Sequence, residues 1–154
     1  MTEADESMFK SVVSKVARYC AYQERSPKEV EEKLRSFNLS FPRIQEAMNF
    51  LREENFFSEE RFCEAYARGK FRLKKWGKIK ISIGLKSHSL DEHQIQKALE
   101  AIPQNDYLET AKSLVSKKHE ALIDLDPNKR LQRLKQYMLS KGYEYDIINQ
   151  IIKS

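Results

Sequence analysis

A short basic stretch holds the side chains of this sequence that are best suited to chemistry. Between Arg68 and Lys80, thirteen residues include seven Lys or Arg and no acid. Like charges this dense repel one another unless a partner neutralises them, so the stretch indicates binding to an anionic surface. The pattern suits contacts with a phosphate backbone better than the reading of base edges. The alternative is a solvated helix whose lysines only confer solubility, with Trp76 packed between neighbouring helices.

A helix must position these basic side chains. Helical spacing puts Arg61, Arg68 and Arg72 on one face of that helix. The same spacing turns four other side chains inward, namely Phe62, Ala65, Tyr66 and Leu73. A turn around Gly77 then gathers the later lysines nearby. The candidate partner-binding residues are therefore Arg61, Arg68, Lys70, Arg72, Lys74, Lys75, Trp76, Lys78 and Lys80.

Sets of residues typical of catalysis or metal binding are missing from the sequence. His88 and His93 bracket a predicted turn without a Cys or a third His at ligand spacing, and we interpret them as solvated histidines at helix ends. Cys20 and Cys63 lie in apolar helical patterns, which favours buried thiols in a reducing cytoplasm over a disulfide. No glycine-rich phosphate loop or nucleophile elbow occurs. We therefore predict a chain that is not an enzyme and needs no metal or cofactor.

Composition and charge narrow the class of partner. Of the 154 residues, 40% are hydrophobic and 33% are charged, which is typical of a soluble folded chain. No apolar run is long enough for a membrane span, and the acidic start lacks the features of a secretory signal, so we expect a cytoplasmic protein. Residues 1–60 hold 9 Lys/Arg against 12 Asp/Glu, whereas residues 61–154 hold 19 against 11. This asymmetry favours a partner that is negative where it meets the second part of the chain.

A weak internal repeat predicts the architecture. Apolar residues recur at offsets of 51 and 53 residues, as in Leu34, Leu85 and Met138, each followed two residues later by Ser. Each match describes a helix, a turn and a second helix, with turns expected at Asn38, Ser89 and Gly142. A further amphipathic helix precedes each pair. The predicted fold is all-α: three tandem three-helix repeats stacked into an elongated, curved array.

The repeat frame gives the domain boundaries. We expect a disordered acidic tail over residues 1–7, then repeat 1 over 8–56, repeat 2 over 57–103 and repeat 3 over 104–154. The predicted helices are 8–23, 27–37, 42–54, 59–74, 77–87, 91–101, 105–121, 127–141 and 144–153. Residues 79–83 alternate as a strand would, but the sequence offers no second strand to pair with, so a helix is favoured there.

Three segments of the sequence resemble the RecX family of bacterial RecA regulators. Residues 55–68 (NFFSEERFCEAYAR) are similar to its acidic–acidic–x–Arg–Phe–Ala segment, and residues 76–81 (WGKIKI) to its Gly–x–x–x–Ile stretch. Residues 25–34 (RSPKEVEEKL) resemble its Arg–x–x–Ser–x–x–Glu–Leu–x–x–Lys–Leu segment. Their order and spacing cover about Val12 to Ile152. The chain departs from the family at Ser87-His88-Ser89, where the family has Lys-Gly, which affects the expected turn geometry.

The resemblance implies a function that composition alone does not show. It implies a regulator, chiefly an inhibitor, that binds in the groove of a RecA filament on single-stranded DNA. Such a regulator would modulate filament assembly, ATP hydrolysis and strand exchange in recombination, DNA repair and the SOS response. We expect a monomer when free. The alternative is a helix–turn–helix protein that binds DNA directly, although neither candidate recognition helix, 42–54 or 91–101, is rich in base-reading Arg and Asn.

Overall fold

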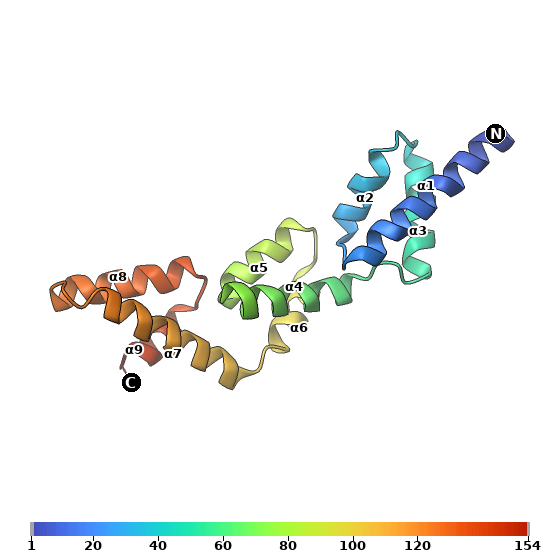
Figure 1. Ribbon diagram of the computed structural model, residues 1–154. Coiled ribbons are helices and arrows are strands. Elements are labelled where there is room, and N and C mark those ends of the chain that lie inside the picture. The colour runs from blue at the N-terminus through green and yellow to red at the C-terminus, as the bar shows by residue number, and fades with distance from the viewer. Residues whose placement is uncertain (1, 154) are drawn as a thin grey trace.

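A computed structural model describes residues 2–153, and this part of the chain contains nine helices and no strand. The first unit comprises α1 (Glu3–Tyr22), α2 (Pro27–Arg35) and α3 (Phe41–Glu53). The second comprises α4 (Glu59–Lys74), α5 (Lys78–Ser87) and α6 (Glu92–Glu100), and the third α7 (Gln104–Ala121), α8 (Pro127–Ser140) and α9 (Tyr145–Lys153). The units follow one another in an elongated array (Figure 1), so the all-α repeat fold predicted from the sequence is confirmed.

Local sequence signals account for where the helices begin and end. Ser26 caps α2 and Asp91 caps α6, each through a capping box with the residue three positions later. The three predicted turns contain backbone in the left-handed region, with φ of 59° at Asn38, 69° at Ser89 and 96° at Gly142. At each of these residues the left-handed backbone ends the second helix of the unit and turns the chain toward the third helix. The same turn in all three units is the physical basis of the weak repeat.

Helix α5 resolves the ambiguous segment 79–83. The segment is helical, as the repeat register predicted, with Ile81 and Leu85 fully buried. Ile79 and Ile83 lie on the opposite side and are exposed. The apparent strand pattern arises because this helix carries isoleucines on both its inner and outer sides.

Three expectations drawn from the sequence are wrong. The acidic tail predicted to be disordered is helical from Glu3 onward, because Thr2 and Asp5 form a capping box at the start of α1; Met1 lies outside the described residues. Leu73, expected to point inward, is 84% exposed. His88 is not simply solvated, since its ring packs against Phe62 with a centroid distance of 5.0 Å.

The nine helices enclose two hydrophobic cores. One core lies within the first unit and is closed by Phe57 in the segment that leads to α4. The other is continuous through the second and third units, from Phe62 in α4 to Ile151 in α9. The second and third units therefore form one packed body, and the first unit forms another.

The two joints between units use the same position of the repeat but different chemistry. At each joint, the second turn of one unit meets the start of the second helix of the unit before it. Between the first two units this contact is polar: Ser26 Oγ lies 3.2 Å from His88 Nδ1, and Lys28 Nζ donates to the Ser87 carbonyl over 3.2 Å. Between the last two units backbone meets backbone, because the Gly77 N–H donates to the Lys141 carbonyl over 2.8 Å.

Candidate partner-binding surface

The turn between α4 and α5 carries much of the basic stretch, and the third unit holds it in place. Helix α4 ends at Lys74 and is capped by Lys75, whose backbone is left-handed with φ of 59°. Beyond it, the Ile79 N–H donates to the Gly142 carbonyl over 2.9 Å. A Cβ placed on Gly77 would lie 2.4 Å from the Gly142 carbonyl carbon, so only glycine permits this approach.

Two buried tyrosines of the third unit complete the joint. The Tyr107 hydroxyl accepts from the Lys78 N–H over 2.9 Å and donates to Glu144. The Tyr143 hydroxyl donates to the Lys75 carbonyl over 2.9 Å, and the two tyrosine rings stack with their centroids 5.2 Å apart. Burial raises the pKa of both phenols above the ordinary value, so both hydroxyls keep their protons and continue to donate.

Trp76 lies at the centre of a group of lysines beside this joint. The ammonium groups of Lys70 and Lys80 lie 4.9 Å and 4.8 Å from the centre of its ring, within cation–π range. Lys141 joins them from the third unit, where its Nζ donates to the Lys74 carbonyl at the end of α4 over 3.2 Å. We call Lys70, Trp76, Lys80 and Lys141 the lysine cluster.

Lys141 is a member of the cluster that sequence reasoning missed. It lies more than sixty residues from the basic stretch, in a segment whose local charge is not unusual. The repeat register aligns it with His88, and that alignment is the signal that could have identified it. The alignment identifies Lys141 only if one also knows that the turn between α8 and α9 contacts the preceding unit.

Two arginines of α4 face a different surface. Arg68 and Arg72 line a groove of about 220 Å³ whose other lining residues include Glu64, Ile102 and Asp106. Arg72 continues into a neighbouring groove of about 370 Å³ that is also lined by Lys75, Asp106, Glu109 and Thr110. The expected single basic face is thus divided between two sides of one helix.

Three members of the predicted set have other positions. Arg61 lies at the joint between the first two units, where its Nε is 3.1 Å from Glu24 and its Nη2 donates to the Asn55 carbonyl over 2.9 Å. Lys78 is half-buried with its amine 4.8 Å from the centre of the Tyr107 ring. The side chain of Lys74 is exposed beside the lysine cluster. The structure therefore separates Arg61 from the rest of the predicted set.

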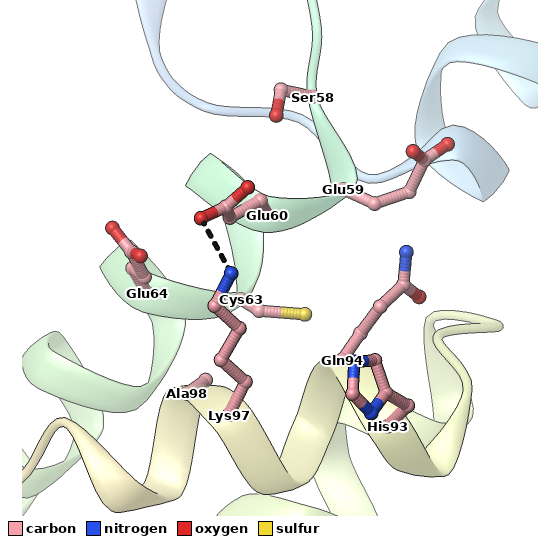
Figure 2. Close-up of a pocket in the computed structure, with 9 residues that line it drawn as sticks. All are labelled: Ser58, Glu59, Glu60, Cys63, Glu64, His93, Gln94, Lys97 and Ala98. Atoms are coloured by element: carbon pink, nitrogen blue, oxygen red, sulfur yellow. Dashed lines mark hydrogen bonds and ion pairs between the residues drawn. The ribbon is translucent and has the colours of Figure 1, made fainter.

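A further pocket, shown in Figure 2, lies between the start of α4 and α6. It has a volume of about 300 Å³ and is lined by Glu59, Glu60, Cys63, Glu64, His93 and Lys97, among others. Lys97 pairs with Glu60 over 3.2 Å. Burial raises the pKa of the Cys63 thiol to about 11, so this thiol is protonated at neutral pH and is a poor nucleophile. Across residues 2–153, no group of three or more His, Cys, Asp or Glu is arranged to hold a metal ion.

Comparison with known families relates two of the three units to one family. A model described as "RecX, second three-helix domain" matches residues 58–99. A second model, "RecX, third three-helix domain", matches residues 105–152. Together these matches cover α4–α6 and α7–α9, which are the units that form the shared core and carry the lysine cluster.

Individual proteins agree with the family models. The chain is 33% identical over 131 residues to "Regulatory protein RecX" of Clostridium perfringens strain 13, covering 84% of this chain and 61% of the relative. It is 25% identical over 149 residues to "Regulatory protein RecX" of Clostridioides difficile strain 630, covering 96% of this chain and 69% of the relative. The chain thus spans about three fifths of the length of the Clostridium perfringens relative.

Solved structures show the same arrangement of helices. The crystal structure of RecX from Lactobacillus salivarius superposes with a TM-score of 0.87 at 27% identity, covering 94% of each chain. A second crystal structure, of a regulatory protein RecX, superposes with a TM-score of 0.89 over 98% of this chain and 74% of that one. At 20% identity, this second likeness supports the fold alone. In the part of the chain that the structure describes, no helix could span a membrane.

Proposed function

This chain belongs to the RecX family, and on that premise we propose that it regulates a RecA-type recombinase by docking on the recombinase filament on single-stranded DNA. It acts by binding, without catalysis and without a cofactor, and it limits filament assembly, ATP hydrolysis and strand exchange in DNA repair. The relatives are named regulatory proteins, which supports a regulatory role, and RecA as the target is our inference from the family resemblance.

The lysine cluster is the observation that carries the proposal. Four cationic or aromatic groups from two units are held beside one joint, and none of the lysines in the cluster forms an ion pair within residues 2–153. Backbone hydrogen bonds across the joint fix their positions before any partner arrives. A pre-positioned cationic surface on an elongated body suits a long anionic polymer such as a DNA-loaded filament.

The proposal is tested with DNA-dependent ATP hydrolysis by RecA, measured with and without this chain at substoichiometric amounts. We expect the chain to lower the rate. The variant Lys74→Glu with Lys75→Glu reverses two exposed charges at the end of α4, one beside the lysine cluster and one in the neighbouring groove. It should bind filaments more weakly, because it places acids against an anionic partner.

A matched control carries the same change of net charge on the first unit. Lys10→Glu with Arg18→Glu alters two exposed residues of α1, far from the lysine cluster, and should inhibit as the unaltered chain does. Circular dichroism must show the same helical content in all three proteins. An unchanged rate of ATP hydrolysis with the unaltered chain would contradict the proposal.

Direct DNA binding is the second candidate, and the same lysine cluster favours it. If the seven basic residues from Arg68 to Lys80 all met phosphates of duplex DNA, the affinity for DNA alone would fall with salt with a log–log slope of about −6. Regulation of the filament instead requires RecA for tight binding. Binding to an oligonucleotide across a salt series, with and without RecA, separates the two.

A further inference from the structure

We propose that the two sides of α4 bind two different classes of partner: the lysine cluster meets the phosphates of the DNA strand, and the opposite groove receives a protein segment of the filament subunit. This inference rests on the proposed function and assigns its contacts. We call this groove the mixed-charge groove: α4 and its cap contribute Glu64, Arg68, Arg72 and Lys75 to one wall, and α7 contributes Asp106 and Glu109 to the other.

Helical geometry separates the two surfaces. Successive residues of an α-helix are about 100° apart, so Arg68 and Arg72 project from nearly the same side. Lys70 projects from roughly the opposite side, where it meets Trp76. One partner surface of simple shape cannot contact both sides of α4 at once.

The α4 wall of the mixed-charge groove is mainly basic and the α7 wall is acidic, yet the two walls do not neutralise each other. None of its six charged side chains forms an ion pair within the described chain. Apolar and backbone-lined surface lies between the walls, including the buried side chains of Phe71 and Ile102. The groove thus offers unpaired cationic and anionic side chains to a bound partner.

Charge excludes a nucleic acid as the occupant of this groove. A phosphate backbone attracted to Arg72 would pass beside the carboxylates of Asp106 and Glu109, which repel it and oppose the attraction. A protein segment that carries both an acid and a base satisfies both walls. The planar guanidinium of an arginine also matches a carboxylate through two parallel hydrogen bonds. The lysines of the lysine cluster, on the other side of α4, act as point charges instead.

The lysine cluster has the reverse character. Its ammonium groups contact the indole ring and backbone carbonyls, and no acidic side chain lies among these contacts. Nothing in the cluster opposes the approach of phosphate, and Trp76 is only partly buried. A polyanion is therefore the partner that this side of α4 fits.

Neutral isosteres of the acidic wall give the sharpest test, because the two possible occupants predict opposite signs. For Asp106→Asn with Glu109→Gln, a protein occupant predicts that filament binding weakens, by about fivefold or more on loss of charge pairs. Binding to an oligonucleotide alone should not change. A phosphate occupant predicts tighter binding to both, and that result would overturn the inference.

The lysine cluster supplies the reciprocal variant. Lys70→Gln with Lys80→Gln should weaken binding to the oligonucleotide alone and flatten its salt dependence by about two contacts. Trp76 is the single tryptophan of the chain, so its fluorescence reports DNA arriving at the cluster. The acidic-wall variant should retain this fluorescence response. A DNA response lost equally in both variants would contradict separate surfaces.

These measurements also distinguish the inference from the function on which it rests. If the unaltered chain binds filaments and the acidic-wall variant binds them equally well, the division of contacts is wrong and the proposed function stands. If the unaltered chain neither binds filaments nor alters ATP hydrolysis, both are wrong. Thermal unfolding by circular dichroism confirms that each variant is folded.

Discussion

At the scale of single residues, the joint between the second and third units depends on the absence of side chains. Gly77 has ordinary extended backbone angles, so its identity is not required by its own conformation. It is required by its neighbour, because a Cβ would contact the Gly142 backbone at 2.4 Å. Gly142 is restricted in the same way, because a Cβ placed on it would lie 2.3 Å from the Cβ of Lys80. Gly142 also has a positive φ, which favours glycine.

Gly77→Ala should therefore destabilise the protein by about 2 kcal/mol or more, since backbone cannot retreat as a flexible side chain can. The free energy of unfolding from urea denaturation measures this. Gly69→Ala is the matched control: Gly69 lies inside α4 with nothing within 4 Å of a new Cβ, so alanine should stabilise by roughly 0.5–1 kcal/mol. Equal effects of the two changes would contradict the close approach at the joint.

Sequence reasoning at this scale identified the basic stretch but not how its members are divided. Charge is visible in the sequence, whereas the direction of each side chain depends on which face of α4 the core covers. Leu73 shows the difficulty, because it is apolar and predicted to point inward, yet it is exposed. Phe71, two positions earlier, is the side chain that packs into the core. Lys141 could not be placed beside the end of α4 without the contact between units.

At the scale of helices, Ser26 has two roles. Its hydroxyl accepts from the Glu29 N–H over 3.1 Å as the cap of α2, and it also contacts His88 of the second unit. It is fully buried, although serine is usually exposed at helix starts. A capping residue thus also serves as the contact point between two bodies.

Ser26→Ala should cost more than the loss of a cap alone. We expect a destabilisation of about 2 kcal/mol or more, because a buried polar contact with His88 is lost together with the cap. Asp91→Ala is the control, since Asp91 caps α6 through the same type of box but is exposed; about 1 kcal/mol is expected. Chemical denaturation compares the two, and similar losses would argue against a role for Ser26 in the joint.

The helices themselves were predictable, because caps, turn residues and apolar spacing act locally. The predicted and observed bounds differ by a few residues, except at α1, where the acidic start joins the helix. Acidic residues in a first turn interact favourably with the helix dipole, and Thr2 supplies the cap. The segment that we predict as a tail therefore has the features of a helix start. The helix over residues 79–83 could be predicted from the repeat register but not from local propensity.

At the scale of the whole molecule, three similar units form two packed bodies. The rings of Phe71, Tyr107 and Tyr143 pass from one unit into the next and join their cores. Within residues 2–153, no equivalent aromatic bridge reaches the core of the first unit, where charged and polar side chains make the contact. The sequence could not reveal this division, because the repeat register is the same at both joints.

Two leucines at equivalent positions of the repeat test this division. Leu34 and Leu85 are both fully buried, and replacing either by alanine should cost about 3 kcal/mol in its own body. Hydrogen exchange should then speed up over residues 3–53 only for Leu34→Ala, and over 59–153, including α7–α9, for Leu85→Ala. Faster exchange in α7–α9 of the Leu34→Ala protein would contradict two separate cores.

The unequal joints give the molecule a mechanical consequence. A few polar contacts resist bending less than a shared aromatic core does, so we expect thermal bending to concentrate between α3 and α4. The spacing between the lysine cluster and the mixed-charge groove stays constant, because both lie within the stiffer body. In the proposed complex with the filament, the second and third units would therefore hold the two binding surfaces at one spacing, while the first unit could change its orientation relative to them.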